Sequence, residues 1–168
     1  MFPPLKFEKN ILKLLDQRKL PSREIWISCR TSKQVQEAIR QMVVRGAPAI
    51  GVAAGYGLYL GISKFKGSPA QFFKKLEAEA EFLKTARPTA VNLRNVVDGI
   101  VAAVKSWVGA PLAGARSGRA QGPALHLIKR VVLTEARRAH TEDDRHASTA
   151  ERSRSRGRTE TQCSMATR

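Results

Sequence analysis

Residues 43–57 read Val-Val-Arg-Gly-Ala-Pro-Ala-Ile-Gly-Val-Ala-Ala-Gly-Tyr-Gly, which predicts a break in the chain followed by a buried helix. Arg45-Gly46-Ala47-Pro48 interrupts an apolar pattern. Pro48 suits the first turn of a new helix, because the amide hydrogen that proline lacks would have no helical partner there. We expect this helix to run to about Lys64. Its glycines each cost about 1 kcal/mol relative to alanine, so we expect another helix or a ligand to approach them closely.

The segment before this stretch predicts a pair of strands and one helix. Residues 11–16 and 24–29 are short apolar or alternating runs separated by a turn-forming segment, which is typical of a β hairpin. A helix capped by Thr31 or Ser32 should follow, because apolar residues then recur at the three-four spacing of one helical face. That helix is expected to end near Val44.

The segment after the stretch predicts two more helices. Ser68-Pro69 is an N-cap followed by a first-turn proline, and an amphipathic helix follows it. Thr89 is expected to cap the last helix, which reaches about Trp107. Residues 1–107 therefore predict a mainly α fold with a small amino-terminal β hairpin.

The charge of the protein is unevenly distributed along the sequence. The 168 residues include 30 Lys+Arg and 14 Asp+Glu, for a net charge of +16, which by itself suggests a nucleic-acid-binding protein. However, residues 1–108 have a balance of +10 and all ten aromatic residues, whereas residues 109–168 have a balance of +6 and no aromatic residue. We therefore divide the chain into a domain, 1–108, and a tail, 109–168.

The tail is expected to be disordered or to result from a shifted reading frame. Eight of its sixty residues are apolar and larger than alanine, too few to offset the entropy of ordering, so at most one short helix is expected, around 124–139. Its Arg-rich composition resembles that of a polypeptide translated from GC-rich DNA in the wrong frame. Arg-Ser dipeptides can contact RNA phosphates, but the tail has no aromatic residue for base stacking, so we do not expect specific nucleic-acid binding.

The two cysteines indicate a cytoplasmic protein with reduced thiols, and one long uncharged run favours a buried helix over a membrane span. Cys29 and Cys163 have no metal-ligand spacing and no secretory leader precedes them. Cys29 is expected to be a small core residue and Cys163 an incidental thiol. The uncharged run 46–63 is as long as a membrane span, but half of it is Gly or Ala, which favours a buried helix. The three histidines also lack ligand spacing, so no metal is expected.

Two arginines each precede a predicted helix start. Arg45 lies before Ala47-Pro48, and Arg87 lies before Thr89. A helix amino terminus offers unpaired N–H groups and about half a positive charge, so an arginine beside it favours binding of an anion such as phosphate. The small residues Gly46 and Ala47 would let a ligand approach the backbone. If the fold brings the two corners together, Arg45, Gly46, Ala47 and Arg87 are the candidate residues for binding a sugar phosphate.

Three segments resemble the methylthioribose-1-phosphate isomerase family. They are residues 14–21 (Leu-Leu-Asp-Gln-Arg-Lys-Leu-Pro), residues 43–57, and residues 86–93 (Ala-Arg-Pro-Thr-Ala-Val-Asn-Leu). Their order and spacing resemble the amino-terminal third of that family, over about residues 11–107. The wider family includes ribose-1,5-bisphosphate isomerases and the regulatory subunits of a translation initiation factor. A protein like the former, or a binding module like the latter, is the alternative interpretation.

The resemblance implies both a fold and a reaction. Residues 1–108 would be the family's amino-terminal helical domain. The family converts an aldose 1-phosphate, 5-methylthioribose 1-phosphate, into the ketose 1-phosphate in methionine salvage, without a metal or an organic cofactor, and is usually dimeric. In the family, the stretch matching Arg45-Gly46-Ala47 and the arginine matching Arg87 bind this substrate.

The catalytic part of the family does not occur in these 168 residues. The family's catalytic Cys, in a Thr-His-Cys-Asn-Ala-Gly stretch, and its catalytic Asp lie in a later doubly wound α/β domain. Cys163 shares only the cysteine with that stretch, and Asp16 and Asp98 are expected to be structural. We therefore assign no catalytic residue, and expect a truncated isomerase with little or no turnover of its own.

Overall fold

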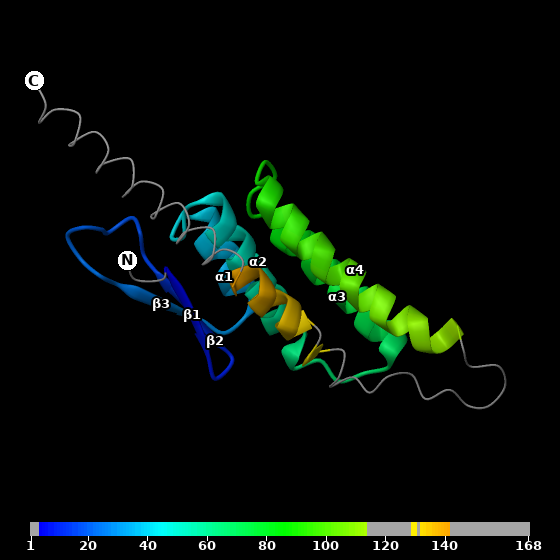
Figure 1. The fold of residues 1–168 in the computed structure, drawn as a ribbon. Helices are drawn as coiled ribbons and strands as arrows, with labels where there is room; N and C mark the ends of the chain where they lie inside the picture. Colours follow the sequence, from blue (N-terminus) through cyan, green and yellow to red (C-terminus); the bar gives the residue numbers. More distant parts are fainter. Residues whose placement is uncertain (1–3, 114–128, 131, 142–168) are drawn as a thin grey trace, which may run out of the picture.

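The computed structural model describes residues 4–113, 129–130 and 132–141. A three-stranded sheet precedes the helices, and α2 lies between the sheet with α1 on one side and α3 with α4 on the other (Figure 1). The expectation of a mainly α fold with a small amino-terminal sheet is confirmed. The elements are β1 (Leu5–Glu8), β2 (Ile11–Leu15), β3 (Trp26–Cys29), α1 (Ser32–Arg40), α2 (Ala47–Ser63), α3 (Pro69–Lys84) and α4 (Val91–Ala113).

The sheet is antiparallel, in the order β1-β2-β3, and one face of it is buried. Leu5 pairs with Leu14, and Leu12 pairs with Cys29, so alternate residues of each strand face the helices. The predicted hairpin is the β2-β3 pair. The additional strand β1 was not predicted, because the turn that joins it to β2 has Lys9 and Asn10, both at positive φ, in place of the glycine that signals such a turn.

Helix α1 ends earlier than the apolar pattern predicts. The amides of Met42 and Val43 donate to the carbonyl oxygens of Ile39 and Ala38, which is the Schellman arrangement of a helix carboxyl end. Met42, at φ 58°, takes the left-handed position that glycine usually occupies. The sequence therefore contains no signal for this ending, and the helix stops at Arg40 rather than near Val44.

The start of α3 agrees with its capping signal, whereas α4 differs from the expectation mainly at its carboxyl end. Ser68 and Gln71 form a capping box at the start of α3, as the Ser68-Pro69 signal indicates. Helix α4 begins at Val91, two residues after Thr89, and continues to Ala113 rather than ending near Trp107. Side-chain caps thus mark the starts of α1 and α3, at Thr31 and Ser68.

Helix α2 is buried almost all round, and its glycines are contact points. A Cβ at Gly51 would lie 3.0 Å from the carbonyl oxygen of Asn92 in α4, and one at Gly57 would lie 2.9 Å from Cγ1 of Val35 in α1. The glycines therefore allow the close helix approach that the sequence predicts. No helix in the described part of the chain is long and apolar enough to span a membrane.

A helical segment at 132–141 packs onto the core from beyond the predicted domain boundary. Val132 and Ala136 are fully buried, and Ala136 lies against Gly55 of α2. The ammonium group of Lys129 donates to the carbonyl oxygens of Ser63 and Phe65 at 2.7 and 2.8 Å, at the carboxyl end of α2. This segment overlaps the short helix expected around 124–139.

The described structure thus continues past residue 108, where the composition changes. Composition could not locate the folded region because the segment attaches through a few aliphatic side chains, those of Val132, Leu133, Ala136 and Ala139, together with polar contacts of Lys129. The predictions of disorder and of a shifted frame for residues 114–128 and 142–168, and those for His126, His146 and Cys163, lie outside the described residues. His140 lies within them, with its Nδ1 atom 3.1 Å from the hydroxyl of Tyr56.

Candidate functional site

Helices α2 and α4 run in the same direction, so their amino ends lie together. Gly51 lies against Asn92 and Val96, and one turn later Gly55 lies against Val96 and Ile100. Both helices start at the same end of the bundle (Figure 1). The structure therefore brings together the two corners that the sequence singles out.

The first corner is the start of α2. Gly46 occupies the N-cap position at φ 91°, and no side chain caps the helix. Arg45, Gly46 and Ala47 are all exposed, and a Cβ at Gly46 would meet nothing within 4 Å. The first N–H groups of α2 are therefore accessible to an anion, in the positive field of the helix end.

The second corner is the turn before α4. The amide of Ala90 donates to the carbonyl oxygen of Arg87 at 3.0 Å, and Nε of Arg94 donates to the carbonyl oxygen of Pro88 at 3.1 Å. Arg87 is half-buried. Within the described residues, the guanidinium groups of Arg45 and Arg87 make no ion pair or hydrogen bond, so both are available to a ligand.

One acidic residue lies beside Gln17, which contacts the first corner. The carboxylate next to the first corner is that of Asp16, and it forms an ion pair with Arg18. Nε and Nη2 of Arg18 donate hydrogen bonds to the two carboxylate oxygens at 2.8 and 2.7 Å. This guanidinium lowers the pKa of the buried Asp16 carboxyl group below its usual range. Asp16 is therefore an ionised, paired structural group, in agreement with the role expected for it.

Asp98 is also structural. It lies on the exposed side of α4 and pairs with Lys84 of α3, which a second carboxylate, that of Glu81, also contacts. These contacts join the carboxyl end of α3 to α4. Neither Asp16 nor Asp98 has a free carboxylate for proton transfer.

Sequence reasoning missed the contribution of residues 16–18 to the first corner. The amide of Gln17 donates to the carbonyl oxygen of Val43 at 3.0 Å, and the side-chain oxygen of Gln17 accepts from the amide of Arg45 at 3.1 Å. These residues belong to the 14–21 segment that carries the family resemblance. The segment was identified as a motif, but its contact with Arg45 depends on the tertiary structure.

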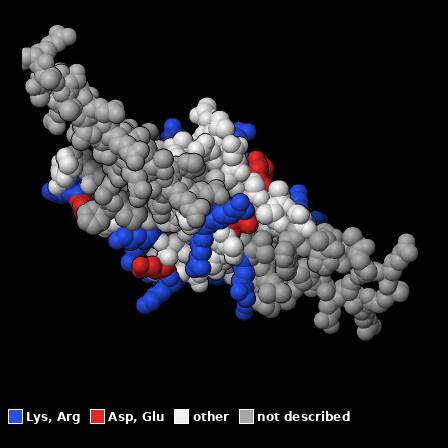
Figure 2. Space-filling model, in the orientation of Figure 1, with Lys and Arg blue, Asp and Glu red and all other residues white. Residues whose placement is uncertain are grey.

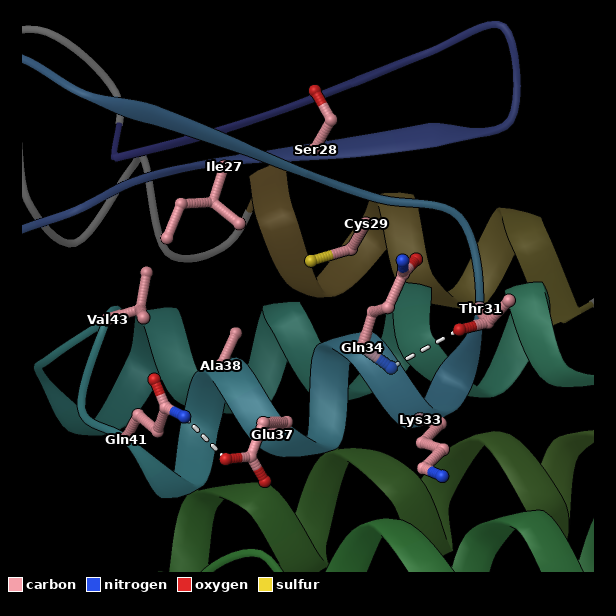
Figure 3. A pocket seen from close by; sticks show the side chains of 10 residues that line it. All are labelled: Ile27, Ser28, Cys29, Thr31, Lys33, Gln34, Glu37, Ala38, Gln41 and Val43. Carbon is pink, nitrogen blue, oxygen red and sulfur yellow. Dashed lines mark hydrogen bonds between the residues drawn. The ribbon is translucent and has the colours of Figure 1, made fainter.

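A separate hollow of about 510 Å³ lies between β3 and α1 (Figure 3). Cys29, Ile27 and Ala38 contribute apolar lining, and Lys33 and Glu37 contribute polar lining. Burial raises the pKa of the Cys29 thiol to about 11, so it stays protonated at neutral pH and offers no thiolate nucleophile. Cys29 is therefore a core residue, as expected, and neither Arg45 nor Arg87 lines this hollow.

The basic residues within the described part of the chain do not form a single stripe on the face seen in Figure 2. Lys and Arg side chains are spread over several parts of it, and Asp and Glu side chains lie among them. This distribution differs from the continuous basic surface that tracks a nucleic-acid backbone. The charge pattern of this face therefore gives no support to a nucleic-acid interface.

Comparison of the sequence with curated proteins finds methylthioribose-1-phosphate isomerases. That of Maridesulfovibrio salexigens is 54% identical over 87 residues, which is 52% of this chain and 25% of the relative. That of a Picosynechococcus strain is 36% identical over 141 residues, 83% of this chain and 37% of the relative. The chain thus spans about a quarter to just over a third of the length of these relatives.

Two solved structures have a similar fold. The 5-methylthioribose 1-phosphate isomerase of Pyrococcus horikoshii OT3 matches with a TM-score of 0.69 and 33% identity, over 84% of this chain and 36% of that one. The delta subunit of translation initiation factor eIF-2B from A. fulgidus matches with a TM-score of 0.69 and 30% identity, over 85% of this chain and 38% of that one. The resemblance found in the sequence is confirmed.

A comparison with models of protein families shows to which family the chain belongs. The model described as the initiation factor 2 subunit family matches residues 43–143, which is more than half of the chain. The match includes both corners, α2 and α4, and it continues through the helical segment at 132–141. The chain belongs to the initiation factor 2 subunit family.

Proposed function

We propose that this chain is the amino-terminal domain of a 5-methylthioribose 1-phosphate isomerase and that it supplies the phosphate-binding half of the substrate site. The observation that carries the proposal is the side-by-side arrangement of the amino ends of α2 and α4, each with an arginine that has no partner among the described residues. The names of the relatives support the substrate class. Methionine salvage in the cytoplasm and a homodimeric assembly are further parts of this proposal.

In this site the phosphate group would lie between the two corners. Arg45 and Arg87 would each direct a guanidinium group at phosphate oxygens, and the amide of Ala47 would donate from the start of α2. The absence of a side chain at Gly46 leaves room for the oxygens to reach the backbone. The role of these four residues is to hold the sugar so that its first two carbons have a fixed position.

Isomerisation itself needs a group that moves a proton between those carbons. In the described part of the chain the carboxylates of Asp16 and Asp98 are paired with cations, and the Cys29 thiol is protonated and buried. We therefore propose that the 168-residue chain binds the substrate but does not turn it over. A domain of the kind that carries the Thr-His-Cys-Asn-Ala-Gly stretch would have to supply proton transfer.

Calorimetric titration of the purified chain with 5-methylthioribose 1-phosphate tests binding. We expect the wild-type chain to bind, and Arg45→Ala and Arg87→Ala each to weaken binding by about tenfold or more, because each removes a charge-assisted pair with the phosphate. Arg30→Ala is the matched control, since Arg30 is exposed and lies after β3, away from both corners. Equal affinity of all four proteins would reject the site.

A second candidate function is supported by the eIF-2B delta structure, which matches this chain as well as the isomerase structure does. In that function the chain would be a binding module that contacts translation factors. Recovery of translation factors on the immobilised chain, together with no heat of binding for 5-methylthioribose 1-phosphate, would favour the module over the isomerase domain.

A further inference from the structure

We infer that Gln17 is a positioning residue for the phosphate corner and sets the place of Arg45 through the backbone. This inference rests on the proposed function, because it concerns the same corner. It gives a role to the 14–21 segment, which the proposed site leaves without one. Gln17 itself would not touch the ligand.

Gln17 holds the chain before α2 at two points. Its amide donates to the carbonyl oxygen of Val43, and its side-chain oxygen accepts from the amide of Arg45. The two contacts lie on either side of Val44, so one residue fixes two backbone positions in this segment. Arg45 directly precedes the N-cap residue Gly46. The position of the Arg45 backbone therefore determines where its side chain leaves the chain and where the first turn of α2 begins.

The segment that Gln17 holds lies between two residues in the left-handed region. Met42 has φ 58° and Gly46 has φ 91°, so the chain changes direction before and after Val43, Val44 and Arg45. The side chains of Val43 and Val44 are buried and anchor this segment to the core. The amide of Val43 donates to the carbonyl oxygen of Ala38, whereas the carbonyl oxygen of Val43 and the amide of Arg45 are bound by Gln17. Gln17 therefore provides the hydrogen bond at the Arg45 end of the segment.

Gln17 is in turn held by its neighbours. The amide of Asp16 donates to the carbonyl oxygen of Ile25 at 2.8 Å, which fixes the residue before Gln17 at the end of β2. On the other side, Arg18 is clamped by the Asp16 carboxylate, and its Nη1 reaches the side-chain oxygen of Gln41 at 3.2 Å. The residues on both sides of Gln17 are thus tied to the sheet and to the end of α1. A rigid support of this kind is what makes a hydrogen bond able to orient a binding group.

The test compares two glutamines that make the same kind of bond. Gln17→Met keeps the length of the side chain and removes the oxygen that accepts from Arg45. Gln34→Met is the matched control, because the side-chain oxygen of Gln34 accepts from the amide of Arg30 at 2.7 Å, at the start of α1. Each variant of the 168-residue chain is titrated with 5-methylthioribose 1-phosphate, and its stability is measured by urea unfolding.

We expect both variants to lose similar stability, and Gln17→Met alone to bind 5-methylthioribose 1-phosphate about five- to tenfold more weakly than the wild type. We also expect the amide of Arg45 to exchange with solvent faster in Gln17→Met, and its protection to return in Gln17→Glu, which keeps an acceptor oxygen. Gln17→Asn, which is too short to reach the amide, replaces Gln17→Met if that variant does not fold.

The outcomes separate this inference from the proposed function. If the wild-type chain binds the sugar phosphate and Gln17→Met binds it as tightly as Gln34→Met does, the positioning role is overturned and the proposed site stands. If the wild-type chain does not bind, the proposed site is overturned and the inference falls with it. Unchanged exchange of the Arg45 amide in Gln17→Met also overturns the inference.

Discussion

Gly51 of α2 lies directly against the backbone of Asn92 in α4, where a Cβ would come within 3.0 Å of the Asn92 carbonyl oxygen. This contact holds the amino ends of the two helices together, and with them the two arginine corners. A backbone atom cannot move aside as the end of a flexible side chain can. The geometry of the candidate site therefore depends on the absence of a side chain at position 51.

Replacing this glycine tests the contact. We expect Gly51→Ala to lower the free energy of unfolding by about 1–2 kcal/mol, because the cost of overpacking exceeds the gain in helix propensity. Gly99→Ala is the control, since a Cβ at this exposed position of α4 meets nothing within 4 Å. It should stabilise the protein by about 0.5–1 kcal/mol. Urea unfolding of the two variants checks both values, and stabilisation by Gly51→Ala would contradict the close approach.

The Asp16–Arg18 pair predicts a dependence of stability on pH. The pKa of Asp16 is lower in the folded protein than its ordinary value of 3.8, mainly because Arg18 donates hydrogen bonds to the carboxylate. The stabilisation that Asp16 provides is therefore fully present above about pH 4 and is lost as the pH falls through the lower, folded-state pKa.

Asp16→Asn should cost about 1–3 kcal/mol of stability at pH 7, and the difference from the wild type should shrink below about pH 4. Urea unfolding at pH 7, 5 and 3 measures this. Glu37→Gln is a useful control, because Arg40 also lowers the pKa of Glu37 but that pair is exposed. A difference between Asp16→Asn and the wild type that stays constant down to pH 3 would falsify this account.

The helical segment at 132–141 should unfold together with the rest of the domain. Val132 is fully buried, so Val132→Ala should reduce the free energy of unfolding by about 1–3 kcal/mol in a single transition. Thr134→Ala is exposed on the same segment and should change stability by less than about 0.5 kcal/mol. If Val132→Ala has no effect in urea unfolding followed by circular dichroism, the segment is not part of the cooperative fold.

The shifted reading frame expected for the tail, residues 109–168, can be tested in the gene. The family match continues to residue 143, well beyond the change in composition at residue 108. We predict that the coding DNA after codon 143, read in another frame, encodes a Thr-His-Cys-Asn-Ala-Gly stretch. Sequencing of the gene and its downstream region checks this, and the absence of such a stretch in every frame would reject the hypothesis.

The sequence alone determined the elements whose signals are local. The Thr31 and Ser68 caps, Pro48 and the three-four spacing of apolar residues predicted helices within a few residues of α1, α2, α3 and α4. Alternation in 11–16 and 24–29 predicted the β2-β3 hairpin. These signals are readable because a cap, a proline or a periodic face acts within one or two turns of the chain.

The tertiary structure decided everything that depends on residues far apart in the sequence. Strand β1, the ending of α1 at Arg40, and the docking of residues 132–141 have no local signal. Each depends on a partner elsewhere in the chain or on a residue in an unusual conformation, such as Met42 after α1. The sequence singled out Arg45 and Arg87 separately. Their placement at one end, and the support of Arg45 by Gln17, followed only from the parallel packing of α2 and α4 and from the contact between the end of β2 and the chain before α2.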